Sequence, residues 1–246
     1  MSFRVLTYNI RRGGAGREDP LAEVISACRP DLVIVQEATR PRVIQELAKA
    51  CGMADCGALP RTSLGFLSAK PVRERRWFRP RFSRHAFLEV LPEGVDFRVF
   101  GVHLSAVHAA WTERRRAIEL RSLLRAVERH QEGMHLLTGD FNTLAPGEFL
   151  DVTALPRRLR PLVWLSGGTI RWRTIQLVID AGYADGYRRT HPGDPGFTFP
   201  VWAPHVRLDY AFLPAAHAGR LESVEIVRHP ATLTASDHFP LLAEIS

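Results

Sequence analysis

Carboxylate, amide and imidazole side chains recur at or just beyond the ends of strand-like runs, at Asn9, Glu37, His103, Asp140, Asn142, Asp209, Asp237 and His238. Side chains in such positions can converge above one edge of a sheet. A cluster of oxygen donors and histidines without cysteine suits Mg²⁺ or Mn²⁺ better than zinc. Because carboxylates that lie close together raise each other's pKa values, such a cluster needs a divalent cation.

A divalent cation beside arginines would suit the hydrolysis of a phosphate ester. In-line attack on a phosphodiester or phosphomonoester accumulates charge on the non-bridging oxygens, and a metal ion with cationic donors stabilises that charge. Taken singly, each residue also has an ordinary structural explanation. Asn and Asp are common turn residues after a strand, and His103 or His238 can be a hydrogen-bonded histidine at a strand end.

The hydrophobic pattern predicts the elements that would position these residues. Strands are expected over residues 3–10, 31–37, 64–69, 85–91, 97–104, 134–142, 206–213, 221–227 and 240–245. Helices are expected over 20–30, 41–51, 112–133 and 174–181, with Thr112 and Gly133 able to cap the third. The segment 146–173, rich in proline and arginine, receives no assignment.

Strands grouped in runs, with helices between the runs, predict two sheets that pack together and are covered by helices. The chain has 246 residues, of which 46% are apolar and 24% charged, so we expect one folded α/β domain over residues 1–246. Cys28, Cys51 and Cys56 form no CxxC pair, which fits a reducing compartment. With no apolar leader and no run of transmembrane length, we expect cytoplasmic residence.

The basic character of the chain comes almost entirely from arginine. The formal charge is +7, and Lys49 and Lys70 are the only lysines among 33 basic residues. Arginine suits phosphate, so an anionic partner is expected, although genome composition alone could produce this bias. Residues 73–85 interleave arginine with aromatic residues and could contact nucleic acid or form an exposed hairpin. Arg114 to Arg116 are expected on a solvated helix face.

Six short motifs follow one another between residue 7 and residue 238, in the order "TYN", "QE", "HL", "GDFN", "RLDY" and "SDH". Together they resemble the endonuclease/exonuclease/phosphatase superfamily. The stretch "PGFTFPVWAPHVRLDYAFL" resembles the segment that many members carry before the last strands. The resemblance implies a four-layer α/β/β/α sandwich of two mainly antiparallel sheets flanked by helices, with the active site over one end.

The resemblance also implies a role for each matching residue. Glu37 would bind Mg²⁺ or Mn²⁺ directly, Asn9 would help to position the ion or its water, and Asp237 would lie close to it. Arg11 stands two residues after the asparagine of the first motif, where exonuclease III and related abasic-site enzymes carry aspartate. This difference adds a cation near the expected phosphate and argues against abasic-site endonuclease activity.

The remaining matches would carry the catalytic steps. Asp140 would orient or deprotonate the attacking water, and Asn142 would hydrogen-bond a phosphate oxygen. Asp209 would pair with His238 and hold its tautomer. Beside two carboxylates, His238 should have a raised pKa, which favours an imidazolium near the phosphate. His103 would contact the scissile phosphate or assist the leaving group.

The predicted function is a Mg²⁺- or Mn²⁺-dependent phosphodiester hydrolase, with nuclease activity favoured by the positive charge. The alternatives are a phosphatase or sphingomyelinase-like phosphodiesterase, and a catalytically silent nucleic-acid-binding module. The expected partner is therefore nucleic acid, or else a small phosphorylated molecule or phospholipid head group, and the chain is expected to act as a monomer. Residues 143–173 and 186–205 are expected to determine the choice of substrate.

Overall fold

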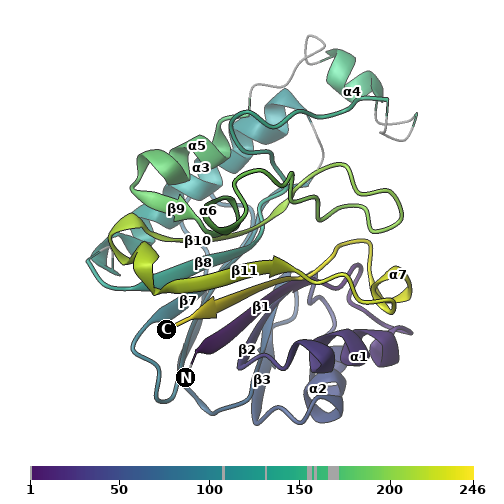
Figure 1. The fold of residues 1–246 in the computed structure, drawn as a ribbon, viewed down its shortest axis with the longest axis vertical. Helices are drawn as coiled ribbons and strands as arrows, with labels where there is room; N and C mark the ends of the chain where they lie inside the picture. Colours follow the sequence, from purple (N-terminus) through teal and green to yellow (C-terminus); the bar gives the residue numbers. More distant parts are fainter. Residues whose placement is uncertain (1, 107–108, 131, 154–156, 158–159, 166–171) are drawn as a thin grey trace.

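A computed structural model describes residues 2–106, 109–130, 132–153, 157, 160–165 and 172–246. Two six-stranded sheets pack face to face, and helices cover the outer face of each sheet (Figure 1). This is the four-layer α/β/β/α sandwich that the sequence predicts. Within the described ranges, no helix combines the length and the apolarity needed to cross a membrane.

The first sheet, sheet A, has the strand order β11-β12-β1-β2-β4-β3. Its strands are β1 (Phe3–Asn9), β2 (Leu32–Gln36), β3 (Asp55–Ala58), β4 (Leu64–Ser68), β11 (Leu221–Ile226) and β12 (Leu241–Ile245). The central pair, β1 and β2, runs parallel, and the other neighbours run antiparallel. Sheet A is therefore mainly antiparallel, as predicted.

The second sheet, sheet B, repeats this plan with the strand order β5-β6-β7-β8-β10-β9. Its strands are β5 (Val72–Phe78), β6 (Phe87–Pro92), β7 (Arg98–His103), β8 (His135–Asp140), β9 (Tyr183–Asp185) and β10 (Asp209–Pro214). Here β7 and β8 form the parallel pair at the centre. In both sheets the parallel pair brings two carboxyl ends to the same edge.

Within the described ranges, the longer helices cover the outer faces of the sheets. Helices α1 (Glu18–Cys28) and α2 (Pro41–Ala50) lie on sheet A, whereas α3 (Ala110–Val127) and α5 (Thr174–Asp180) lie on sheet B (Figure 1). The shorter elements are α4 (Arg160–Leu165), α6 (Gly186–Thr190), α7 (Thr232–Ala235) and the 3-10 helices η1 (Glu128–His130) and η2 (Ala215–Arg220). Helix α3 begins before Thr112, whose hydroxyl accepts a hydrogen bond from Ala109 N at 3.2 Å, and it ends at Val127 rather than near Gly133.

Alternate residues of the central strands enter different layers. Val5 of β1 packs between the two sheets, and its neighbour Leu6 packs against α1 and α2. In β7, Val99 lies between the sheets and Phe100 lies under α3. The interior strands are thus buried on both faces, which explains why they appear in the sequence as nearly continuous apolar runs.

The hydrophobic pattern does not predict β3, β5 or β9. Strand β5 has the sequence VRERRWF and lies at the edge of sheet B, so only its pairing with β6 makes it a strand. Arg76 of β5 forms an ion pair with Glu89 at 2.7 Å, and Trp77 Nε1 donates to the carbonyl of Leu64 at 2.9 Å. Residues 73–78 are therefore part of a hairpin, and these two side chains serve the fold.

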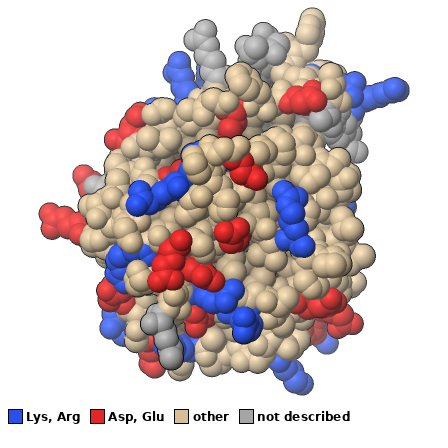
Figure 2. All heavy atoms as spheres, viewed as in Figure 1, with Lys and Arg blue, Asp and Glu red and all other residues tan. Residues whose placement is uncertain are grey.

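The arginines do not form one continuous patch on the face drawn in Figure 2. Among the described residues on that face, Lys and Arg side chains are interspersed with Asp and Glu. Several arginines are ion-paired, as Arg98 is with Glu89 at 2.8 Å. The charge of +7 alone therefore does not locate a binding surface.

Candidate active site

Strand register brings three of the predicted residues into one row across sheet B. His103 at the end of β7 is paired with Asp140 at the end of β8, and Asp140 is paired with Asp209 at the start of β10. Parallel β7 and β8 end at the same edge, and antiparallel β10 begins there. The sequence pattern placed Asp209 inside a strand from residue 206, whereas β10 begins at Asp209 itself.

Gly139 determines how Asp140 is placed. Its φ is +146°, and a Cβ at this position would lie 1.9 Å from the backbone oxygen of Val102 in the neighbouring strand β7. No side chain fits at that distance, so only glycine lets β8 approach β7 so closely just before Asp140. Steric exclusion of any side chain therefore explains why glycine precedes the aspartate of "GDFN".

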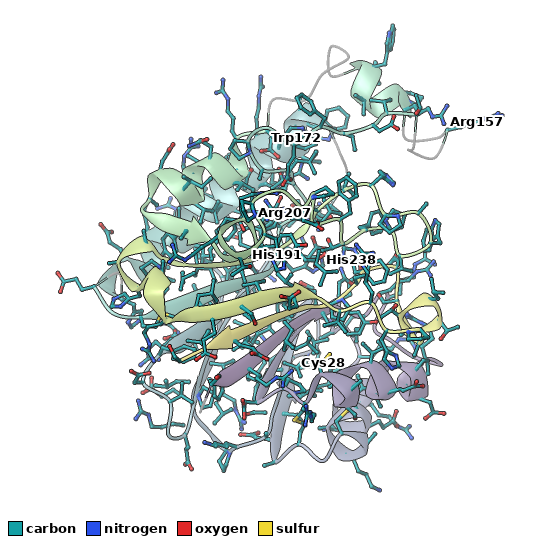
Figure 3. All side chains as sticks on the ribbon, viewed as in Figure 1. Cys28, Arg157, Trp172, His191, Arg207 and His238 are labelled. Atoms are coloured by element: carbon teal, nitrogen blue, oxygen red, sulfur yellow. The ribbon has the colours of Figure 1, made fainter. Side chains whose placement is uncertain are left out.

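His238 reaches the row from the segment between α7 and β12, and it lies among the loops at the ends of the strands (Figure 3). Its Nδ1 is 2.9 Å from Oδ2 of Asp209, and its Nε2 is 4.0 Å from Oδ2 of Asp140. Ser236 Oγ donates to the backbone carbonyl of Asn9 at 2.6 Å, which ties this segment to β1. The imidazole is thus held between the two carboxylates.

Both oxygens of Asp140 accept hydrogen bonds from residues that the sequence predicts for the site. Asn9 Nδ2 donates to Oδ2 at 3.0 Å, which links sheet A to sheet B, and the backbone N–H of Asn142 donates to Oδ1 at 2.9 Å. Asn142 has a φ of +53°, and its side-chain Nδ2 donates to the carbonyl of Leu104 at 3.1 Å. These contacts fix the orientation of the carboxylate.

Burial and neighbouring charge set three unusual pKa values in the row. Burial raises the pKa of Asp140 to about 7, with Asp209 adding to the rise and His238 opposing it. Burial alone would lower the pKa of His238, but Asp209 and then Asp140 raise it to about 10, as its neighbours predict. Burial, with His85 and His238 nearby, lowers the pKa of His103 to about 3. At neutral pH, His238 is therefore cationic and His103 is neutral.

The residues predicted to hold the metal lie on the sheet A side. Glu37 follows β2 with a φ of +56°, and its Oε2 accepts a hydrogen bond from Arg12 N. Asn9 ends β1, and its Oδ1 accepts from Arg11 N at 2.9 Å. The guanidinium of Arg11, the predicted substrate cation, lies with Nε 3.3 Å from Oδ2 of Asp237. The structure therefore pairs Arg11 with a predicted metal ligand.

A second arrangement of metal-binding groups also occurs. Among the described residues, the acidic and histidine side chains close enough to hold an ion jointly are Asp140, Asp209 and His238, whose ligand atoms lie within 4.8 Å of one another. His238 is protonated and already hydrogen-bonded to Asp209, so it is better suited to donate a hydrogen bond than to coordinate a metal ion. Oδ1 of Asp209 is buried and has no hydrogen-bond partner among the described residues. This unsatisfied oxygen and the excess of carboxylates fit a nearby hard cation.

The order of the motifs and the geometry of the row agree with a known family. The model of the Endonuclease/Exonuclease/phosphatase family matches residues 6–238. The chain belongs to this family. No curated protein sequence matches the chain.

Solved structures with the same fold include other members of this group. A 3′ phosphatase from Neisseria bound to a product DNA hairpin is 19% identical, with a TM-score of 0.72 and 99% of each chain covered. An AP endonuclease from Archaeoglobus fulgidus is 16% identical, with a TM-score of 0.75 and the same coverage. An endonuclease/exonuclease/phosphatase from Beutenbergia cavernae is 22% identical, with a TM-score of 0.72, and the match covers 99% of this chain and 71% of that one. At these identities the likeness establishes the fold.

In this family member, helix α3 carries buried charges that the sequence does not predict. Arg114 and Arg115 are exposed, as expected for a solvated face, but Arg116 is 0% exposed, so that prediction is wrong for Arg116. Its Nε donates to Glu113 at 3.0 Å, and its Nη1 donates to the carbonyl of Ser105 at 2.8 Å. Arg116 continues the stripe of Leu120, Leu123 and Val127 by one turn, and this spacing could have identified it as buried.

Glu113 connects three segments around the row. Its Oε2 accepts from Thr143 Oγ1 at 2.7 Å, directly after Asn142. Its Oε1 accepts from the backbone N–H groups of Arg173 at 2.7 Å and Thr174 at 2.8 Å, where α5 begins. One buried carboxylate therefore joins α3, α5 and the segment that follows the "GDFN" motif.

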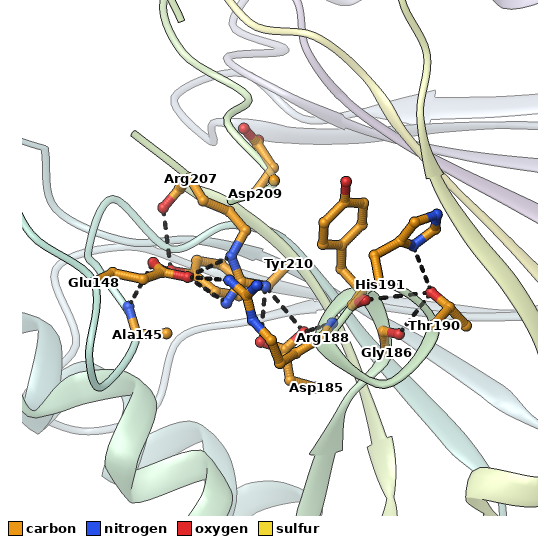
Figure 4. Close-up of polar contacts among 12 residues, drawn as sticks. Ala145, Glu148, Asp185, Gly186, Arg188, Thr190, His191, Arg207, Asp209 and Tyr210 are labelled. Carbon is orange, nitrogen blue, oxygen red and sulfur yellow. Dashed lines mark hydrogen bonds and ion pairs between the residues drawn. The ribbon is translucent and has the colours of Figure 1, made fainter. Parts of the chain in front are cut away.

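Arg207 anchors the chain just before Asp209. It is 1% exposed and lies between the carboxylates of Glu148 and Asp185 (Figure 4). Its Nε donates to Glu148 Oε1 at 2.8 Å, and its Nη1 is 2.7 Å from Asp185 Oδ2. The arginine of "RLDY" thus holds the segment after the Asn142 loop against the start of β10.

Proposed function

We propose that this protein is a divalent-metal-dependent phosphodiesterase that cleaves nucleic acid by in-line attack of water. The observation that supports this most strongly is the placement of buried His238 against Asp140 and Asp209 of the row, because it sets a carboxylate with a pKa of about 7 beside a cationic imidazole. A general base works best when its pKa lies near the operating pH. A phosphate placed over this row would meet a base and a cation at once.

In this proposal Asp140 accepts the proton of the attacking water. Its two hydrogen bonds, from Asn9 and from the backbone of Asn142, hold the carboxylate so that the water is aimed at phosphorus. The second amide hydrogen of Asn142 would donate to a non-bridging oxygen. Such aimed donors stabilise the charge that develops during the reaction.

His238 and His103 take different roles because their charges differ. His238, cationic through Asp209, would stabilise the negative phosphate with its Nε2–H. His103 lies with Nε2 3.8 Å from Asp140 Oδ2 and is neutral, so it would contact the phosphate by a hydrogen bond. The proton for the leaving oxygen would then come from water or from His238.

We propose that Mg²⁺ or Mn²⁺ binds through Glu37, with Asn9 and Asp237 as supporting oxygen donors. These hard donors and the buried, unsatisfied Oδ1 of Asp209 fit a divalent cation. When bound, the ion would supply charge stabilisation for the non-bridging oxygens. Arg11, beside Asp237, would add a further positive charge at the sheet A side of the phosphate.

Nucleic acid is the proposed substrate because of the arginine content and the related structures. The Neisseria relative is described as a 3′ phosphatase bound to a DNA hairpin, and the Archaeoglobus relative as an AP endonuclease. A substrate panel of DNA, RNA, bis(4-nitrophenyl) phosphate, sugar phosphates and sphingomyelin, with wild type and Asp140→Ala side by side, tests the proposal. Release of inorganic phosphate from the sugar phosphates, without cleavage of nucleic acid, would favour a phosphatase. Cleavage of sphingomyelin without cleavage of nucleic acid would favour a sphingomyelinase-like phosphodiesterase.

A further inference from the structure

A pocket of about 480 Å³ is lined by His85, whose ring neighbours that of His103. Its lining includes Arg84, His85, Ser105, Trp111, Thr112 and Arg115. These residues come from three places: the segment before β6, the segment after β7 and the first turns of α3. The centroids of the His85 and His103 rings lie 5.7 Å apart, so His85 links the pocket to the proposed catalytic row.

The lining of this pocket is cationic. Arg84 and Arg115 are both exposed, and among the described residues none that lines the pocket carries a carboxylate. The pocket also lies at the N-terminal end of α3, an 18-residue helix whose dipole places partial positive charge there. Two guanidinium groups and a helix N-terminus favour an anion such as a phosphate.

The pocket walls are held in place by a buried carboxylate. Glu119 of α3 is 0% exposed and accepts hydrogen bonds from the backbone N–H of Arg84 at 3.1 Å and of Ser105 at 3.3 Å. Ser105 Oγ also donates to Glu119, at 3.2 Å. All three lining segments thus meet at Glu119, and the hydrogen-bonding capacity of its carboxylate is taken up by these contacts.

The pocket also offers an aromatic surface. Trp111 is 51% exposed although it belongs to α3, and an exposed indole beside cations is the kind of surface on which a nucleic-acid base can stack. His85 adds a second ring, and burial lowers its pKa, so this ring is neutral at pH 7.

We propose that this pocket binds the nucleotide next to the scissile phosphate of a nucleic-acid strand, with Arg84 and Arg115 on its phosphate and Trp111 on its base. The proposal rests on the proposed function and narrows its substrate to a polymer. A sugar monophosphate or the sphingomyelin head group would occupy the catalytic row and offer neither a second phosphate nor a base. The pocket lies outside residues 143–173 and 186–205, where the sequence placed substrate choice.

Binding of a fluorescent single-stranded oligonucleotide, measured by anisotropy in an Asp140→Asn background that slows turnover, tests the pocket directly. Arg84→Ala with Arg115→Ala should weaken binding at least tenfold, and the slope of log Kd against log salt should fall by about 0.7 for each phosphate that the variant no longer neutralises. Trp111→Ala should weaken binding about tenfold, and Trp111→Phe should restore most of it. Arg121→Ala with Arg125→Ala, the same loss of two charges at exposed positions of α3 outside the pocket, is the control.

The outcomes separate this proposal from the proposed function. If the pocket double variant binds the oligonucleotide as tightly as the control double variant Arg121→Ala with Arg125→Ala does, with the same salt slope, the pocket is not the subsite, whatever wild type hydrolyses. If the pocket variants weaken binding but wild type with Mg²⁺ cleaves neither oligonucleotide nor bis(4-nitrophenyl) phosphate, the subsite stands and the proposed hydrolysis fails.

Discussion

Asp209 and His238 are 29 residues apart in the chain, and Nδ1 of the histidine lies 2.9 Å from Oδ2 of the aspartate. Both residues are buried, at 1% and 5% exposure. A carboxylate in this position fixes the proton on Nδ1 and stabilises the imidazolium. Nε2 is thereby left to face Asp140, on the side where the proposed phosphate would lie.

Replacing Asp209 by asparagine should uncouple this pair. Burial lowers the pKa of His238 and Asp209 is the largest cause that raises it, so Asp209→Asn should shift the pKa down from about 10. The loss of the cation should reduce kcat on the order of 10²-fold. Titration of the His238 ring by NMR together with steady-state kinetics measures both effects. Asp180→Asn on the exposed end of α5 is the control, and a His238 pKa that does not move would refute this account.

Glu37→Gln tests the proposed metal ligand. The amide keeps the shape of the side chain and an oxygen that can accept from Arg12 N, but it loses the charge that attracts a divalent ion. We expect chelator-treated protein to be inactive, and the concentration of Mg²⁺ needed for half-maximal activity to rise at least tenfold in Glu37→Gln. Glu46→Gln, an exposed change on α2, should leave the Mg²⁺ dependence as in wild type. An unaltered Mg²⁺ requirement in Glu37→Gln would place the ion elsewhere.

Gly139→Ala tests the steric origin of the Asp140 position. The new Cβ would meet the Val102 backbone at 1.9 Å, so β8 must move away from β7. We expect a loss of more than about 3 kcal/mol in the free energy of unfolding and loss of activity. Gly147→Ala also places alanine at positive φ, but with nothing within 4 Å, and should cost about 1–2 kcal/mol. Denaturant unfolding that shows equal destabilisation of the two variants would contradict the clash.

Glu113→Gln tests the buried link between α3, α5 and the "GDFN" segment. Burial would raise the pKa of Glu113, but Arg116 and the hydrogen bonds lower it below its ordinary 4.5. The ionised group therefore stabilises the fold above pH 4.5, and this contribution falls by about 1.4 kcal/mol per pH unit below 4.5, down to the folded pKa. Glu113→Gln should cost about 3 kcal/mol at pH 7 and less at pH 4. Denaturant unfolding at the two pH values checks this, and a difference that does not depend on pH would argue against it.

The motifs predicted the residues of the row, but not how the residues meet. Asp209 could be identified from "RLDY", whereas its position opposite Asp140 depends on antiparallel pairing of β8 and β10, which is a long-range property. The hydrophobic pattern does not show the polar edge strand β5, because its charged side chains hide the period. An exposed hairpin over residues 73–85 is one of two interpretations of the sequence, and only the pairing with β6 defines the strand.

Arg116 shows a second limit of the sequence. Arg116 lies at the spacing of the buried apolar residues of α3. A run of three arginines is nevertheless typical of a solvent-exposed face, unless buried carboxylates that pair with one of them are known. Glu113 lies three residues before Arg116 on the same helix and can reach it in any helix, but the burial of both side chains is established only when α3 packs on sheet B. The assignment of residues 1–246 to one domain stays a prediction, as do the roles of the site residues.

The measurement that tests the central claim most directly is the rate of hydrolysis of DNA, RNA and bis(4-nitrophenyl) phosphate by wild type and by Asp140→Asn, each with Mg²⁺ or Mn²⁺. The buried row predicts cleavage by wild type and a loss of kcat on the order of 10²–10⁴-fold in the variant. The variant should unfold cooperatively on heating, as wild type does. Equal rates for the two proteins, or no cleavage of any of these substrates by wild type, would contradict the account.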